Sequence, residues 1–200
     1  MPNPIEFYFD YSSPYAYLAS EMIDGLAAKY GRQVQWRPIM LGATFQKTGL
    51  PLLITIPLKG EYSKRDIVRS SRYYGIPFAF PEKFPLSTQI AARAYYWLHG
   101  QDCAKAREFS HAVFRAYWVN GRDIADLAVV LQIAGDLGIE KADLAAAVAS
   151  PEIKERLKTE TDGAIAKGMF GAPYFVVDGE PFWAADRLPQ LEKWLQTGGF

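Results

Sequence analysis

The stretch that joins the first predicted strand to the first predicted helix is IEFYFDYSSPYAYL, residues 5–18. Its first half is rich in β-branched and aromatic residues, which is typical of a strand. Ser13 then precedes Pro14, and this pair favours a helix with a serine cap and a proline in its first turn. Apolar residues recur at helical spacing for four turns, until Gly31 ends the pattern. The sequence therefore predicts a strand that turns directly into a helix at Ser13.

A second strand is predicted over residues 34–40, so the chain begins with a βαβ unit. Near the other end, a helix starts at Ser150-Pro151 and is followed by strand patterns at 174–177 and 181–184. A last helix is predicted over about residues 186–196. The fold class that this order favours is α/β, with a thioredoxin-like core (βαβ…αββα) interrupted by a large all-helical insertion.

The middle of the chain carries the pattern of the insertion. A Pro/Gly-rich loop is predicted over residues 49–60. Helical periodicity marks about residues 43–48, 63–74, 87–99, 103–119, 125–137 and 141–149. We expect residues 1–40 and 165–200 to form the thioredoxin-like domain and residues 41–164 to form a helical insertion domain with a core of its own.

The composition excludes several classes of protein. The chain has 200 residues, of which 50% are hydrophobic and 22% charged, so it is expected to be globular rather than disordered. Lys and Arg together number 22, as do Asp and Glu, so the net charge is zero. A protein that binds nucleic acid or an anionic membrane through its charge carries an excess of basic residues, so we expect neither partner.

Cysteine and histidine are scarce. Cys103 is the only cysteine, which excludes an intrachain disulfide, and two histidines with it cannot complete a tetrahedral zinc site without carboxylates. The N-terminal residues show no basic segment followed by a long apolar one, and no apolar stretch approaches the length of a membrane span. A cytoplasmic protein is the expectation.

Ser13 is the first candidate for a functional site. Free N–H groups and the positive end of the helix dipole converge at such a cap, and an anion placed there is stabilised. In a βαβ unit this position lies at the carboxyl end of a strand, where open α/β folds bind ligands. The alternative is that Ser13 only caps the helix.

Two further candidates lie near the C-terminus. Gly171-Ala172-Pro173 opens a predicted strand, and a cis bond before Pro173 would turn the backbone of Ala172 towards a peptide-like ligand. The alternative is a proline that protects an edge strand. Asp186 starts the last predicted helix, where a plain N-cap is the competing interpretation.

Four segments, FYFDYSSPYAYL, LKGEY, YGIPFAFP and FGAPYFVVDGEPFWAADRL, together resemble the 2-hydroxychromene-2-carboxylate isomerase family. That family is similar to the kappa-class glutathione transferases and belongs to the DsbA-like branch of the thioredoxin fold. DsbA-type oxidoreductases begin their first helix with Cys-Pro-x-Cys, whereas this chain has Ser13-Pro14-Tyr15-Ala16. Both thiols are absent, which excludes dithiol–disulfide exchange. The resemblance implies that the thiol comes from bound glutathione.

The resemblance also implies how glutathione is held. Ser13 matches the serine that hydrogen-bonds the glutathione sulfur. Ala172 matches the residue whose backbone pairs with the cysteinyl unit, and Pro173 matches the cis-proline. Lys59 matches a lysine near the glycyl carboxylate.

The γ-glutamyl end would be held by the motif around Asp186, which matches the acid that binds the ammonium group. Ala185 stands where the kappa enzymes have a serine, so only its backbone N–H could serve the γ-glutamyl carboxylate. Arg187 follows in the same motif. Leu50 falls where the kappa enzymes have an asparagine, and we expect glutathione to bind more weakly as a result.

The implied function is glutathione-dependent isomerisation of 2-hydroxychromene-2-carboxylate to trans-o-hydroxybenzylidenepyruvate, or of a related unsaturated aromatic keto acid, in aromatic catabolism. The implied partners are glutathione, a small aromatic keto acid and a second copy in a homodimer. One alternative is a kappa-like glutathione transferase or peroxidase. Another is a thioredoxin-fold binding protein without catalysis, which Leu50 and Ala185 favour.

Other chemically capable residues are expected to be structural. His99, His111 and Cys103 lie on predicted helices or in polar stretches where ordinary packing is the simplest interpretation. The aromatic residues at 95–97 and 114–118 are expected in the core, although some could face the substrate. One helix face carries Tyr62, Lys64, Arg65, Arg69 and Arg72. It is expected to be solvated, or to offer one arginine to a substrate carboxylate.

Overall fold

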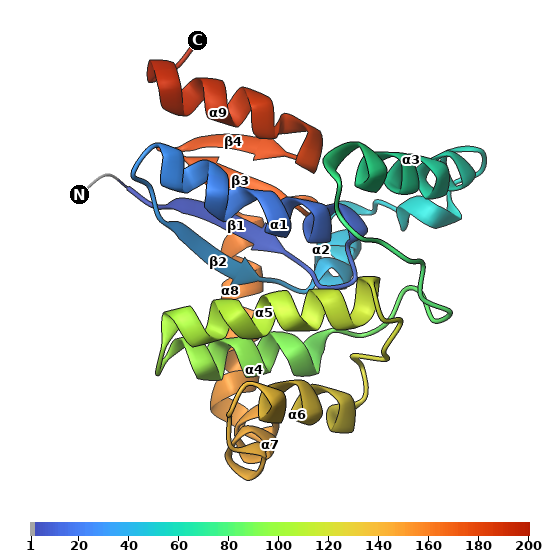
Figure 1. Cartoon of the computed structure of the whole chain (residues 1–200), viewed down its shortest axis with the longest axis vertical. Coiled ribbons are helices and arrows are strands. Elements are labelled where there is room, and N and C mark those ends of the chain that lie inside the picture. Colours follow the sequence, from blue (N-terminus) through green and yellow to red (C-terminus); the bar gives the residue numbers. More distant parts are fainter. Residues whose placement is uncertain (1–2) are drawn as a thin grey trace.

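The computed structural model describes residues 3–200 and places a four-stranded mixed sheet at the centre of the molecule (Figure 1). Its strand order is β2-β1-β3-β4. The strands are β1 (Ile5–Phe9), β2 (Val34–Pro38), β3 (Tyr174–Val177) and β4 (Glu180–Trp183). β1 pairs in parallel with β2, whereas β3 runs antiparallel to both β1 and β4. The predicted βαβ unit and C-terminal hairpin are confirmed.

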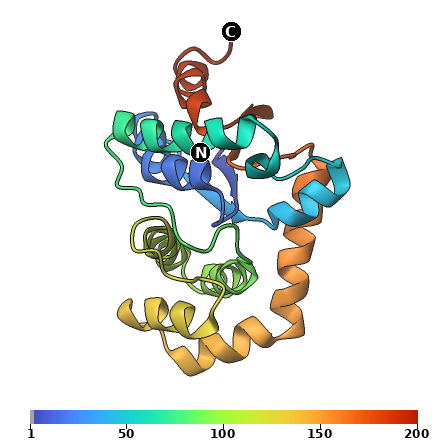
Figure 2. The ribbon, with the colours of Figure 1, turned by 90° about the vertical axis from the view of Figure 1, so that its right-hand side faces the viewer.

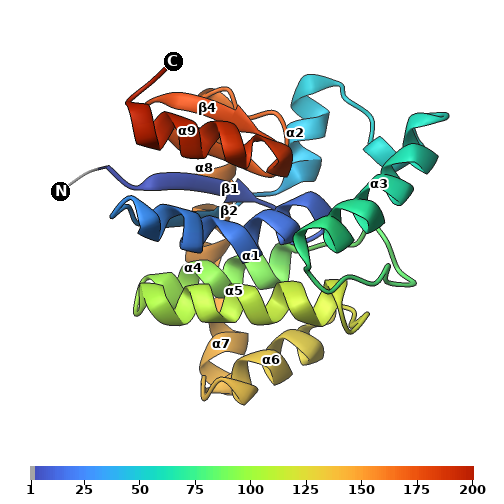
Figure 3. The ribbon, with the colours of Figure 1, turned by 45° about the horizontal axis from the view of Figure 1, so that its top comes forward.

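Helices cover both faces of the sheet. α1 (Pro14–Lys29) and α9 (Leu188–Thr197) lie on one face, and α8 (Pro151–Ala166) lies on the other (Figures 1 and 3). Side chains alternate along β1 accordingly. Phe7 stacks on Phe175 of β3 with ring centroids 5.2 Å apart. The next residue of β1, Tyr8, points the other way and belongs to a second apolar cluster on the α8 side.

The region between the two halves is helical, as predicted, and lies largely below the sheet in Figure 1. α8 runs from its outermost layer back to the sheet (Figure 2). The elements of this region are α2 (Leu41–Thr48), the 3₁₀ turn η1 (Leu53–Thr55), α3 (Lys59–Tyr74), α4 (Gln89–His99), α5 (Cys103–Trp118), α6 (Leu127–Asp136) and α7 (Lys141–Ala149).

One hydrophobic core runs from the sheet into the inserted helices. Phe9 of β1 packs against Phe114 of α5 with ring centroids 5.3 Å apart. The hydroxyl of Tyr95 on α4 donates to the backbone carbonyl of Trp36 on β2 at 2.7 Å. The division of the chain into a thioredoxin-like and an insertion domain stays a prediction. Within residues 3–200, no helix is long and apolar enough to cross a membrane.

Candidate functional site

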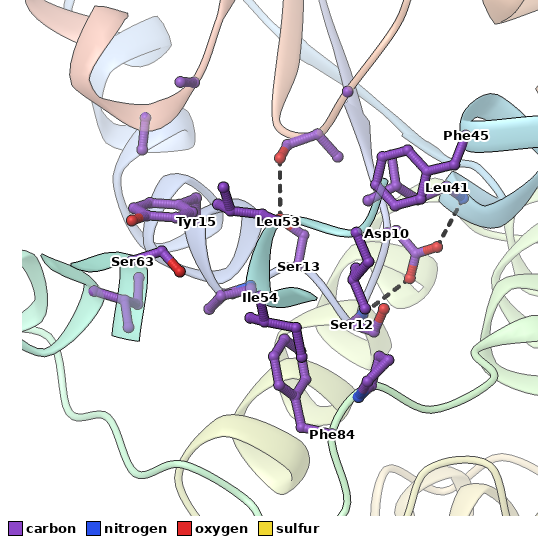
Figure 4. A pocket seen from close by; sticks show the side chains of 18 of the residues that line it. Asp10, Ser12, Ser13, Tyr15, Leu41, Phe45, Leu53, Ile54, Ser63 and Phe84 are labelled. Carbon is purple, nitrogen blue, oxygen red and sulfur yellow. Dashed lines mark hydrogen bonds between the residues drawn. The ribbon is translucent and has the colours of Figure 1, made fainter. Parts of the chain in front are cut away.

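A cavity of about 910 Å³ lies where β1 ends and α1 begins. Its walls also come from α2, η1, α3, the loop before α4 and the turns that flank the β3–β4 hairpin. Figure 4 shows part of this lining around Ser13. The predicted site residues that line it are Ser13, Lys59, Ala172, Ala185, Asp186 and Arg187, together with Leu50. Pro173 is buried behind Ala172.

Ser13 connects the two sides of this cavity. Its hydroxyl oxygen accepts the backbone N–H of Ala16 at 3.2 Å, so the predicted helix cap is confirmed. The same hydroxyl donates to the backbone carbonyl of Ala172 at 3.0 Å. The Ala172–Pro173 peptide bond is cis, as the resemblance implies. Ser13 is therefore both a structural cap and a polar group at the wall of the cavity.

Asp186 does not cap a helix, and that interpretation is wrong. The chain first makes a 3₁₀ turn, η2 (Ala185–Arg187), and α9 begins only at Leu188; neither has a side-chain cap. The backbone of Ala184 turns in the positive-φ region at 82°, which shifts the helix start beyond Asp186. The Asp186 side chain is 66% exposed and lies 3.6 Å from Arg187. Its carboxylate is therefore accessible to a ligand.

Lys59 is the first residue of α3, which begins four residues before the predicted helix. This start depends on a close backbone contact, because a Cβ on Gly60 would lie 2.3 Å from the carbonyl oxygen of Ile54. Only a glycine allows α3 to begin against η1 in this way. Lys64 also lines the cavity, so two cationic side chains stand on the α3 side of it.

Tyr15 ties α3 to the start of α1. Its hydroxyl donates to the Asp66 carboxylate at 2.8 Å, and Arg69 forms an ion pair with the same carboxylate. Burial, followed by the contact with Asp66, raises the pKa of Tyr15 well above its ordinary value. Tyr15 is therefore a neutral phenol that lines the cavity at neutral pH.

Asp10, which precedes the Ser12-Ser13 pair in the turn after β1, is a buried member of the lining to which no role was assigned from the sequence. Its side chain is 4% exposed, and within residues 3–200 no cation forms an ion pair with it. It accepts hydrogen bonds from the N–H of Ser12 at 2.9 Å, the N–H of Leu41 at 2.9 Å and the hydroxyl of Thr88 at 2.8 Å. Burial raises the pKa of Asp10, and these hydrogen bonds lower it in part.

The rest of the lining is mainly apolar. Aromatic side chains come from Tyr15, Phe45, Tyr74, Phe80, Phe84, Phe170 and Trp183. None of the predicted aromatics at 95–97 and 114–118 is among the lining residues, and Tyr95, Phe114 and Trp118 are buried in the core. The walls are thus built by elements at the end of β1 rather than by the helices α4 and α5 below the sheet.

The remaining candidates lie away from the cavity. His111 lies 3.6 Å from both Glu21 and Asp24, at the junction of α1 and α5. Cys103 is exposed, and its sulfur is 3.5 Å from Nε2 of His99. Three arginines of the basic face border a separate shallow groove instead, namely Arg65, Arg69 and Arg72.

Comparison with known proteins gives consistent matches over the whole chain. Residues 4–196 match the model of the DSBA-like thioredoxin domain. The chain is 32% identical to a 2-hydroxychromene-2-carboxylate isomerase of Sphingobium xenophagum, over 98% of this chain and 99% of the relative. It is 29% identical to glutathione S-transferase kappa 2 of Caenorhabditis elegans, over 98% and 93%.

A solved structure of a 2-hydroxychromene-2-carboxylate isomerase superposes on the chain with a TM-score of 0.87. The two sequences are 28% identical, and the superposition covers 96% of this chain and 94% of the other. The relatives named above are enzymes that resemble this chain in sequence, and the solved isomerase also shares its fold. The chain therefore belongs to the DsbA-like thioredoxin family, in the branch of the 2-hydroxychromene-2-carboxylate isomerases and kappa-class glutathione transferases.

Proposed function

We propose that the protein is a glutathione-dependent isomerase that converts 2-hydroxychromene-2-carboxylate, or a related unsaturated aromatic keto acid, to its trans open-chain isomer. The observation that carries this proposal is the Ser13–Ala172 hydrogen bond at the wall of a largely apolar cavity. It joins a polar site suited to a peptide-like thiol with space for a flat aromatic molecule. The match to an isomerase over nearly the full length of both chains supports the same reaction.

The charged residues of the cavity suit the two ends of glutathione. Asp186 offers an accessible carboxylate for the γ-glutamyl ammonium group. Lys59 stands at the start of α3, where its ammonium group and the positive end of the helix dipole favour the glycyl carboxylate. Between them, the backbone of Ala172 and the hydroxyl of Ser13 would hold the cysteinyl unit.

When bound, glutathione supplies a thiolate that adds reversibly to the conjugated double bond, which becomes a single bond and can rotate. The chain has to favour the ionised thiol and stabilise the negative charge that develops on the substrate. The Ser13 hydroxyl and the N-terminus of α1 both favour an anion at this position. Apolar side chains such as Phe45 and Phe84 exclude water and strengthen these interactions.

The test is to follow conversion of 2-hydroxychromene-2-carboxylate by absorbance, with and without glutathione. Turnover that requires glutathione supports the proposal, and turnover without it shows that the thiol is not used. Conjugation of glutathione to an added electrophile, with no isomerisation, would favour the kappa-like transferase. No binding of glutathione in a calorimetric titration would leave the non-catalytic binding protein as the better interpretation.

A further inference from the structure

The turn between β1 and α1 carries two neighbouring serines in different surroundings. The hydroxyl of Ser13 points to the carbonyl of Ala172 across the cavity. Ser12 also lines the cavity and is half-buried, and its backbone N–H donates to the Asp10 carboxylate at 2.9 Å. Figure 4 shows Ser12 next to Asp10, on the side of the turn that faces Phe84. The proposed thiol chemistry uses Ser13 and leaves Ser12 and Asp10 without a role.

The surroundings of Asp10 suit a group that gains and loses a proton. Three donors from the β1–α1 turn, α2 and the loop before α4 fix its orientation. The titratable side chains that interact electrostatically with Asp10 are Tyr11 and Tyr117. Burial raises the pKa of both phenols, so both are neutral at neutral pH. Because burial also raises the pKa of Asp10, the carboxyl titrates closer to neutral pH than an ordinary aspartate.

The substrate of the proposed function needs such a group. In 2-hydroxychromene-2-carboxylate, carbon 2 carries a hydroxyl and is bonded to the ring oxygen. The ring must open before the double bond can rotate. Opening removes a proton from the hydroxyl and delivers one to the phenolate oxygen that leaves. An accessible serine hydroxyl backed by a buried carboxylate can perform both transfers.

We propose that Ser12 and Asp10 form a proton relay that opens the hemiketal ring of the substrate. This inference rests on the proposed function and assigns the ring-opening step to residues other than Ser13. Ser12 is the group that contacts the substrate. Asp10 acts through Ser12 as the proton acceptor.

The step balances without an oxidant or a reductant. The hydroxyl at carbon 2 gives its proton to the Ser12 oxygen, while the Ser12 proton passes to Asp10. The electron pair of the O–H bond forms the carbonyl at carbon 2. The bond from carbon 2 to the ring oxygen breaks, and its electron pair stays on the phenolate. Asp10 then returns the proton to the phenolate through Ser12.

The positions of the two serines fit this sequence of steps. Carbon 2 and the carbon that accepts the thiolate are two bonds apart in the open keto acid. Ser12 and Ser13 are consecutive residues at the wall of the same cavity. One bound substrate can therefore present its hemiketal carbon to Ser12 and its double bond to the thiol held at Ser13.

The experiment compares two substrates that differ only in the need for ring opening. One is 2-hydroxychromene-2-carboxylate. The other is cis-benzylidenepyruvate, which lacks the ortho hydroxyl and cannot close a ring. With Ser12→Ala, we expect the ratio of the rate on the chromene to the rate on benzylidenepyruvate to fall at least tenfold. The matched variant Ser13→Ala is expected to lower both rates by a similar factor.

A second measurement does not involve glutathione. Ring opening and closing racemise carbon 2, so circular dichroism of one chromene enantiomer follows the step in the absence of the thiol. We expect the protein to accelerate racemisation and Ser12→Ala and Asp10→Asn to abolish most of that acceleration. If Asp10→Asn does not fold, Thr88→Val keeps the carboxyl but removes a hydrogen bond that lowers its pKa. The acid limb of the racemisation rate then moves to higher pH.

An unchanged rate ratio and unchanged racemisation in Ser12→Ala would overturn the relay. Equal losses of rate on both substrates in Asp10→Asn would also overturn it, because that result would mean that Asp10 only holds the surrounding loops together. These failures differ from failure of the proposed function, in which the wild-type protein isomerises neither substrate in the presence of glutathione.

Discussion

The hydroxyl of Ser13 donates to the carbonyl of Ala172 at 3.0 Å, although 159 residues separate the two in sequence. A serine hydroxyl has one proton, and the bond to Ala172 already uses it, while the same oxygen accepts the N–H of Ala16. To donate to a thiolate, Ser13 must turn away from Ala172. An N–H group of the ligand can then occupy the carbonyl that is released.

Ser13→Ala is predicted to raise the pKa of the thiol of bound glutathione. A donor aimed at a sulfur anion favours the ionised form, and loss of such a donor typically costs about 10²–10³ in rate. Thiolate absorbance as a function of pH measures the shift. Ser12→Ala is the control, because Ser12 lies beside Asp10 rather than Ala172 and should change this titration little. A titration curve that is the same in Ser13→Ala and wild type would contradict the assigned role.

Asp186→Asn is predicted to raise the half-saturation concentration of glutathione several-fold and to leave the saturated rate nearly unchanged. That combination marks the loss of an interaction made equally in the ground state and the transition state. Steady-state kinetics at varied glutathione concentration test it. Asp162→Asn removes an exposed carboxylate on α8 and serves as the control. An equal change in both variants would mean that Asp186 does not contact the ligand.

Leu50→Asn is predicted to tighten glutathione binding. Leu50 lies at the cavity wall with 48% of its surface exposed, and an amide there could add one neutral hydrogen bond. The expected gain is about 0.5–1.5 kcal/mol, which calorimetric titration resolves. Leu58→Asn is the control, since Leu58 is exposed but is not part of the lining. Unchanged affinity in Leu50→Asn would show that this side chain does not reach the ligand.

Gly60→Ala is predicted to destabilise the start of α3 and to weaken glutathione binding. The added methyl group would lie 2.3 Å from the carbonyl oxygen of Ile54, and relief of such overpacking costs about 1–3 kcal/mol. Urea unfolding and a glutathione titration measure the two effects. Gly25→Ala on α1 meets nothing within 4 Å and should instead stabilise the protein slightly. If Gly60→Ala binds glutathione with wild-type affinity, then the position of Lys59 at the start of α3 does not determine ligand binding.

The charge cluster around His111 predicts a pH dependence of stability. Burial opposes the charged imidazole, but the nearby carboxylates of Asp24 and Glu21, each 3.6 Å away, outweigh it and raise the pKa of His111. A raised pKa stabilises the fold fully below the unfolded value of about 6.5, and this contribution is lost as pH rises through the folded value. His111→Gln should therefore lower the free energy of unfolding more at about pH 5.5 than at about pH 8.5. Urea unfolding at both pH values decides, and an equal loss at both would contradict the prediction.

Local signals were sufficient for the elements that local chemistry determines. The serine–proline pairs at Ser13 and Ser150 start α1 and α8 as predicted. The strand Tyr174–Val177 and the helix Lys141–Ala149 have the predicted bounds. In each of these elements, caps, prolines and periodicity agree with the tertiary packing.

Where α3 and the last helix begin depends on backbone geometry that local sequence patterns do not encode. The early start of α3 depends on the approach of Gly60 to Ile54, and no local pattern encodes that contact. The position of Asp186 outside the last helix depends on the positive φ of Ala184, an unexpected conformation for alanine. These two deviations concern residues that the resemblance assigns to glutathione binding.

The apolar half of the cavity was the least predictable part. Periodicity identifies apolar faces, but it does not tell whether a face packs against the core or borders a cavity. The sequence pattern therefore allowed Tyr95 and Trp118 as wall residues, although both are buried in the core. No sequence pattern indicated Phe45 and Phe84, which do line the cavity. Asp10 lies within the segment FYFDYSSPYAYL, but its role could not be predicted because it depends on donors from Leu41 and Thr88, which are distant in sequence.

The core aromatic residues and the cavity aromatic residues differ in burial, and this difference has an evolutionary consequence. Phe9 and Phe114 are fully buried and join the sheet to the inserted helices. Phe45 and Phe84, which face the cavity, are only half-buried. Replacing the latter pair removes far less buried apolar surface, so it threatens folding less. Under the proposed function, the range of aromatic acids accepted can therefore diversify among descendants, or be redesigned, while the scaffold remains intact.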